Sequence, residues 1–153
     1  MRELFEKLEL KKNILSGRVA SESEITLLFG NFPSFSALQD FLDLIRKYKI
    51  IGQYFNLSTN DDLSGMGMRM KWLTPNQQIE EAYESYPGKI VIGHNYLPIG
   101  MCLAGSGDPY FLKEENSRMN VYRVLHDLSI DDLYRDDMVE FIIPLEELIL
   151  KVG

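Results

Sequence analysis

The sequence has few of the features that mark an exported or membrane protein. Its 153 residues include a single cysteine, Cys102, which excludes an internal disulfide and is compatible with a reducing compartment. The charged segment after Met1 lacks the apolar core of a signal peptide, and no stretch approaches the roughly 20 apolar residues of a membrane span. We therefore expect a cytoplasmic protein without a membrane partner.

The sequence also lacks the motifs of common nucleotide, catalytic and metal sites. There is no GxxxxGK[ST] loop, and residues 65–70 (GMGMRM) lack the last glycine of a dinucleotide fingerprint. Residues 104–108 resemble a nucleophile elbow only superficially, because glycine is missing from both outer positions. His94, Cys102 and His126 match no compact zinc spacing, and the DxDxDG calcium loop is absent. We expect no cofactor, no metal and no enzymatic activity.

Negative charge dominates the sequence, with 23 acidic and 16 basic residues and a formal net charge of −7. Nucleic acid is not expected as a direct partner, because phosphate binding depends on clustered Lys and Arg. A negative field instead raises the association rate with a basic protein. Any one acidic doublet is explained by a solvated surface, whereas the accumulation of doublets on predicted turns favours binding. The candidate contact residues are Asp61, Asp62, Glu114, Glu115, Asp131, Asp132, Asp136 and Asp137.

Helix-start patterns recur along the chain. Capping boxes, in which a Ser or Thr side chain and the Glu or Gln three residues later satisfy backbone N–H groups, begin at Ser21, Ser36 and Thr74. Proline stands at the first helical position after Thr74 and at Pro144, where it is well tolerated. With apolar residues at spacings of three and four, these patterns predict helices over about 2–12, 21–30, Ser36 to about Lys49, 74–86 and 144–150.

Strands are predicted where apolar residues alternate or form short runs between turn residues. Residues 50–57 and 66–72 are expected to pair, and their stripe of Met66, Met68, Met70 and Trp72 is interpreted as core rather than as a contact surface. Further strands are expected in the runs 90–93, 99–104 with 110–112, 119–125 and 139–143, with a tight hairpin at 105–108. The whole chain, 1–153, is expected to form one α+β domain with helices on one face of a curved, mainly antiparallel sheet.

The order of several short motifs resembles the SUKH superfamily, which includes a fungal cell-wall-synthesis regulator and many bacterial immunity proteins. The resemblance covers about residues 21–150 and departs from the family at residues 49–52, where members often carry an Asn-Gly turn. It rests on FPSF at 32–35, WLTP at 72–75, LPIG at 97–100, GSGD at 105–108, and Val121-Tyr122 leading to His126-Asp127. The matching positions are interpreted as fold determinants: Trp72, Pro98, Gly100, Gly105, Gly107, Asp108, His126 and Asp127.

This resemblance implies a non-enzymatic protein that binds and neutralises a cognate bacterial toxin. If that toxin is a basic nuclease, an acidic surface would cover its active site. Two alternatives stay open: a regulatory or scaffold module that binds a partner from the same cell, and a small-molecule binder or hydrolase that uses the Gly105–Asp108 loop with His126. The last requires Asp108 and His126 to converge on a pocket. A monomer or weak dimer is expected.

Overall fold

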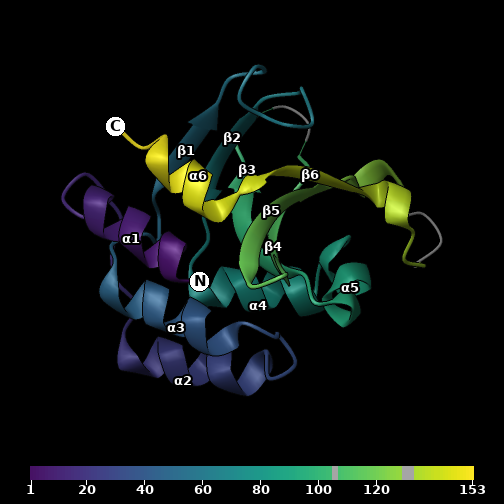
Figure 1. Cartoon of the computed structure of the whole chain (residues 1–153). Helices are drawn as coiled ribbons and strands as arrows, with labels where there is room; N and C mark the ends of the chain where they lie inside the picture. The colour runs from purple at the N-terminus through teal and green to yellow at the C-terminus, as the bar shows by residue number, and fades with distance from the viewer. Residues whose placement is uncertain (105–106, 129–132) are drawn as a thin grey trace.

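Six antiparallel strands form one curled sheet in the computed structural model, which describes residues 1–104, 107–128 and 133–153 (Figure 1). Each strand pairs with its sequence neighbour, so the sheet is a meander. The strands are β1 (Tyr54–Leu57), β2 (Met68–Trp72), β3 (Leu97–Cys102), β4 (Tyr110–Glu115), β5 (Arg118–Val124) and β6 (Val139–Pro144). The predicted α+β fold with a curved antiparallel sheet is confirmed.

The helices accompany this sheet mainly on one face, where the larger hydrophobic core lies. They are α1 (Arg2–Lys11), α2 (Glu22–Asn31), α3 (Leu38–Lys47), α4 (Pro75–Tyr83), α5 (Gly88–Val91) and α6 (Leu145–Leu150). Figure 1 shows α3 between α2 and the sheet, and α6 beside α1. Within the described residues, no helix combines the length and the apolar character needed to cross a membrane.

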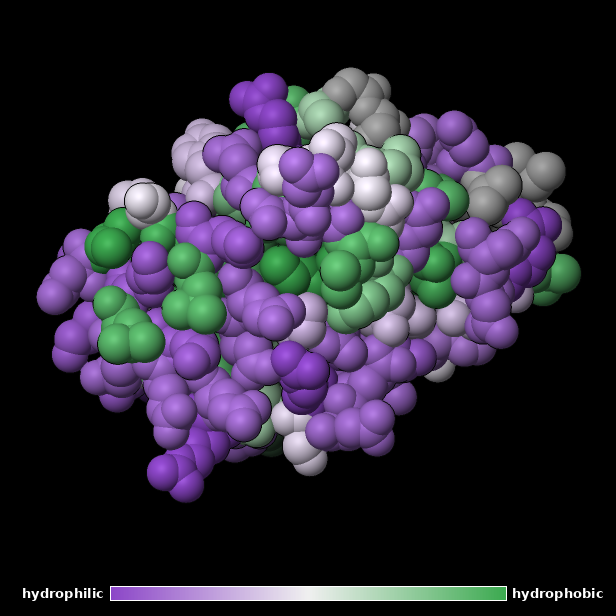
Figure 2. Space-filling model, turned by 45° about the horizontal axis from the view of Figure 1, so that its top comes forward, coloured by the Kyte–Doolittle hydropathy of each residue, from purple (hydrophilic) through white to green (hydrophobic). Residues whose placement is uncertain are grey.

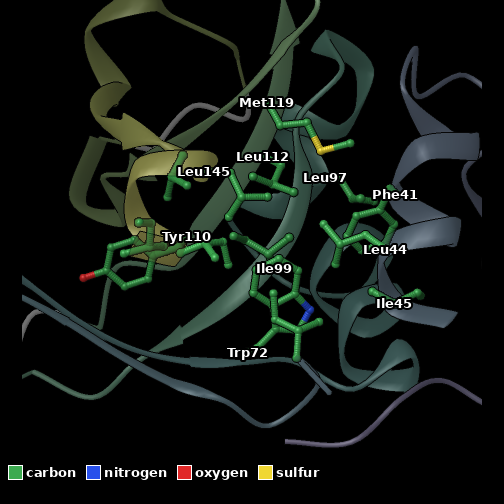
Figure 3. Packing of buried hydrophobic residues seen from close by; sticks show 14 of the residues in the cluster. Phe41, Leu44, Ile45, Trp72, Leu97, Ile99, Tyr110, Leu112, Met119 and Leu145 are labelled. Atoms are coloured by element: carbon green, nitrogen blue, oxygen red, sulfur yellow. The ribbon is translucent and has the colours of Figure 1, made fainter. Parts of the chain in front are cut away.

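The larger core contains the apolar stripe of β2. Met68, Met70 and Trp72 are buried, and the Trp72 ring stacks on Phe41 of α3 with ring centres 6.3 Å apart. Figure 3 shows Leu97, Ile99 and Leu112 of the neighbouring strands meeting these rings and the apolar face of α3. The interpretation of the stripe as core is therefore confirmed, except that Met66 precedes the strand and is exposed.

Two of the three predicted capping boxes are present. The Ser21 and Thr74 side chains accept hydrogen bonds from the backbone N–H groups of Glu24 and Gln77. In return, the Glu24 and Gln77 side-chain oxygens accept the backbone N–H groups of Ser21 and Thr74. The capping box at Ser36 is wrong, because α3 begins only at Leu38 and the Ser36 hydroxyl donates to Glu114. The Ser36 hydroxyl therefore bonds to Glu114, 78 residues away in the sequence, instead of capping the helix.

The predicted strand at 90–93 is also wrong. These residues form α5 and a following 3-10 turn, Ile92–His94. A four-residue apolar run fits a short buried helix as well as a strand. The helix packs tightly on α4: a Cβ added at Gly88 would lie 1.8 Å from the Glu81 carbonyl oxygen, so only glycine fits there.

A smaller apolar cluster lies on the opposite face of the sheet. Phe111 of β4 and Val124 of β5 pack there against α5 and Met138. Adjacent strand residues point to opposite faces, which explains why Phe111 belongs to this cluster and Leu112 to the main core. The cluster covers the β4–β6 side of that face, whereas Tyr54 of β1 and Met101 of β3 remain exposed.

Candidate interaction cleft

A cleft of about 470 Å³ lies between α4 and the end of β3. Its α4 wall carries Glu80 and Glu81, with Ser85 just beyond the helix, and the β3 wall carries Met101 and Cys102. The volume is within the range of roughly 300–1,000 Å³ that is typical of ligand sites. This hollow combines a ligand-sized volume with charged side chains, so it is the candidate functional site.

The local sequence explains how α4 presents these side chains. The Thr74 capping box starts the helix and thereby sets its phase. Gln78 and Ala82 are buried one turn apart, and the Gln78 side-chain amide donates to the Pro98 carbonyl oxygen of β3 at 2.8 Å. Because Gln78 and Ala82 point into the protein, the neighbouring residues Gln77 and Glu81, also four residues apart, lie along the cleft.

Glu81 has the most perturbed acidity in the cleft. Burial raises the pKa of its carboxyl from the ordinary value of 4.5 to about 7, and the neighbouring Glu80 charge adds to the rise. A hydrogen bond with Ser85 acts in the opposite direction but is outweighed. The cleft therefore holds a carboxyl that changes its charge near neutral pH.

The acidic residues at the α4 end of the cleft have no cationic partner in the described structure. Glu80, Glu81 and the helix-capping Glu84 form no ion pair with any residue in the ranges that the structure describes. Some carboxylates of other helices are neutralised, for example in the pairs Arg18–Glu24 and Arg118–Glu146, whereas others, such as Glu3 on α1, have no ion pair in the described structure. Three carboxyl groups without a cationic partner from the described residues therefore lie in or next to the cleft.

The rim of the cleft is apolar and exposed. Tyr86 is 49% exposed and Met101 is 42% exposed. Tyr and Met are enriched in protein–protein interfaces, where a polar rim surrounds an apolar centre. Exposed apolar side chains and carboxyl groups without a cationic partner therefore border the same cleft.

A second hollow, of about 330 Å³, borders α6 and the β1–β2 connection. Figure 2 shows apolar residues gathered near the centre of this side of the molecule, with hydrophilic residues around them. Leu63 and Leu150 are its exposed apolar residues, but its Asp61 is paired with Lys151 at 3.3 Å. This hollow offers less unpaired charge than the α4 cleft.

The acidic doublets predicted as contact residues have different environments. Asp61, Asp136 and Asp137 are exposed as predicted. Asp62 is instead buried, and its carboxylate pairs with the buried Arg123 of β5 at 3.3 Å. The sheet curls until the β1–β2 connection reaches β6, with the Leu63 N–H bonded to the Ile142 carbonyl, and this curl encloses Asp62. Asp131 and Asp132 lie outside the described residues.

Glu114 and Glu115 are not exposed turn residues either. They end β4 and are half-buried, and the turn itself is Asn116-Ser117, whose φ values are both positive. Glu114 accepts hydrogen bonds from Ser36 and from the Ser117 backbone, and Glu115 accepts one from the Tyr122 hydroxyl. In a meander this turn and the β1–β2 connection emerge at opposite ends of the sheet, so these doublets do not form one patch.

Asp108 and His126 do come together. The buried Asp108 carboxylate accepts the His126 backbone N–H at 2.9 Å and also contacts the imidazole Nδ1. The Asp108 hydrogen bond raises the pKa of His126, and Asp127, 3.1 Å from Nε2, adds to the effect. Asp108 thus joins the β3–β4 connection to the segment after β5. Within the described ranges, neither side chain of the pair lines the α4 cleft.

The other motif residues have structural surroundings. Gly107 has a φ of +73°, which suits a turn, whereas Gly100 lies within β3. A Cβ at Gly100 would lie 2.1 Å from the Met70 sulfur, so close packing, not turn geometry, requires this glycine. Pro98 is buried and accepts the bond from Gln78. Gly105 is outside the described residues.

The sequence interpretation missed Glu80 and Glu81, although they too form an acidic doublet. It considered doublets on predicted turns, and these residues lie on a helix. The available signal was the stretch EEAYE at 80–84, with no Lys or Arg between Trp72 and Lys89.

Comparison with known proteins found no matching family model, no matching curated protein and no matching solved structure. The resemblance to the SUKH superfamily therefore rests on the sequence motifs alone.

Proposed function

We propose that this chain is a non-enzymatic protein-binding domain that recognises a basic partner protein, acting as an immunity protein that neutralises a cognate toxin. The observation that carries the proposal is the α4 cleft, where Glu80 and Glu81 line the wall and have no cationic partner in the described structure, as is also true of Glu84 at the end of the helix. Exposed Tyr86 and Met101 beside it add the apolar contact area that protein interfaces use.

Electrostatics favour a basic protein over other partners. The net charge of −7 repels nucleic acid and attracts cationic surfaces, and a localised field increases the rate of productive encounter. Surfaces that bind nucleic acid are themselves basic, so a nuclease toxin is the natural target for such a charge pattern. The SUKH-like motifs agree with an immunity role.

The first test is affinity capture with the tagged full chain from a lysate of the source organism, at low and at high salt. A basic polypeptide that is retained at low salt and lost at high salt, and whose toxicity disappears on co-expression with this chain, supports the proposal. A retained partner whose activity is unaffected contradicts the immunity role and favours the scaffold alternative. Failure to retain any basic protein contradicts both.

Charge reversal provides the matched control. Glu80→Lys with Glu84→Lys should slow association with the captured partner and weaken its salt dependence, because screening acts mainly on exposed charges. Glu3→Lys with Glu147→Lys changes the net charge equally at exposed positions on α1 and α6. Equal slowing by both variants would show that only net charge matters.

The contact between Asp108 and His126 supports one second candidate, a small-molecule binder or hydrolase, although the two side chains do not line the α4 cleft and a ligand would have to bind outside it. A buried carboxylate that orients an imidazole is one part of an acid–base arrangement. A thermal-shift screen of metabolites on the wild type and on His126→Ala tests it: a hit lost in the variant supports this candidate, and identical shifts contradict it.

A further inference from the structure

We infer that the cleft between α4 and β3 receives an arginine side chain from the basic partner. This inference rests on the proposed function, since it specifies which chemical group of the partner binds and where. Glu80 and Glu81 on one wall and Met101 on the other are the residues that carry it.

The arrangement of polar groups matches a guanidinium. Glu81 on α4 and Ser85 just beyond the helix both line the cleft and are hydrogen-bonded to each other, so a carboxylate and a hydroxyl oxygen lie side by side there. Gln77 adds an amide oxygen that already accepts the Thr74 N–H. A guanidinium is planar and carries five N–H donors, and it can bond a carboxylate with two parallel hydrogen bonds. It can therefore bind Glu81 while also donating to Ser85 or Gln77.

The burial of the site favours arginine over lysine. Glu81 is half-buried, so an incoming cation must lose part of its hydration shell. A guanidinium is more weakly hydrated than an ammonium group and is the usual cation of interface ion pairs. Its aliphatic stem can lie against Leu73 and Met101, the apolar part of the lining.

A metal ion and an internal cation are less suitable occupants. Within the described residues, no group of three or more His, Cys, Asp or Glu side chains is arranged to hold a metal. Lys89 lies near the rim, but its ammonium group is 4.9 Å from the centre of the Tyr86 ring and pairs with neither cleft glutamate. The carboxylates thus remain available to a cation from another molecule.

The test is a titration of the ¹⁵N-labelled full chain with the peptide acetyl-Gly-Arg-Gly-amide, followed by NMR. We expect shifts of the amides of residues 77–86 and 100–102, with a Kd of about 1 mM, as is reasonable for a single side chain. The isosteric citrulline peptide, which lacks the charge, should produce none of these shifts. The lysine peptide should bind several-fold more weakly.

Variants make the test specific to the cleft. Glu80→Gln with Glu81→Gln should weaken binding of the arginine peptide at least about tenfold. Glu3→Gln with Glu147→Gln removes the same charge from α1 and α6 and should leave binding unchanged. An unperturbed spectrum away from the cleft verifies folding. Equal binding of the citrulline peptide, shifts centred elsewhere, or unchanged affinity in the cleft variant would overturn the inference.

The captured partner separates this inference from the proposed function. If the wild type and the Glu80→Gln/Glu81→Gln variant retain the same partner equally, the cleft assignment is overturned while protein binding stands. If the wild type retains no basic protein but the arginine peptide binds in the cleft, the proposed function is contradicted and the arginine site stands.

Discussion

Glu81→Gln is expected to stabilise the protein at alkaline pH while changing its stability little at acidic pH. In the native state burial raises the pKa of Glu81 from 4.5 to about 7, whereas in the unfolded chain the carboxyl is hydrated and keeps its ordinary value. Because the native pKa is the higher one, its contribution to stability is full below pH 4.5 and is lost as the pH rises through 7. Above that pH the native protein holds a half-buried charge, which glutamine removes.

The pKa difference sets the size of the effect. A rise from 4.5 to about 7 corresponds to about 3 kcal/mol at 1.36 kcal/mol for each pH unit. Water reaches the half-buried carboxyl and screens it, so we expect a gain of about 1–2 kcal/mol at pH 8.5. The groups around Glu81 are Glu80 on α4, Ser85 just beyond the helix, Tyr86 with Lys89 above its ring, and Cys102 on β3.

Urea unfolding at pH 4.5 and pH 8.5 measures this effect. The Glu81→Gln midpoint should exceed that of the wild type at pH 8.5 and lie close to it at pH 4.5. Glu80→Gln is the matched control. Glu80 is exposed, so this variant removes a charge next to Glu81 but no buried charge, and its gain in stability at pH 8.5 should be smaller. Equal midpoints at pH 8.5, or the same gain at both pH values, would refute the attribution to burial.

Two further predictions concern the other charged clusters. Arg123→Ala should destabilise the protein by about 3–5 kcal/mol in urea unfolding, because it leaves the buried Asp62 without its partner. The double variant Arg123→Met with Asp62→Asn should recover most of that loss. If it recovers none, the pairing of Arg123 with Asp62 is contradicted. The pKa of His126, followed by NMR, should lie above 6.5 in the wild type and should fall in Asp108→Asn. The stabilisation by protonated His126 is therefore full below pH 6.5 and is lost as the pH rises through the native pKa. An unchanged pKa of His126 in the variant would contradict the role of Asp108.

Features that depend on neighbouring residues could be predicted from the sequence. The caps at Ser21 and Thr74 involve atoms only three residues apart, and the pairing of β1 with β2 follows from alternating apolar residues. The prediction failed at Ser36, where a distant glutamate competes for the hydroxyl, and at 90–93, where the run is too short to show a period.

The candidate site required the tertiary structure. Nothing in the sequence shows that Asp62 is enclosed by the curl of the sheet, or that Glu81 rather than a turn doublet stands in a cleft. Asp108 and His126 are 18 residues apart and meet only because the β3–β4 connection and the segment after β5 converge.

The sequence by itself determined the class of fold, because hydrophobic periodicity and capping act over a few residues and decide which segments become strands and helices. It also determined the net negative charge. Only the tertiary structure decided which carboxylates are neutralised and which face a cleft, because burial and ion pairing depend on distances between segments far apart in the chain. Only the tertiary structure shows that Asp62 is paired inside the protein, whereas Glu81 faces the cleft without a cation from the described residues.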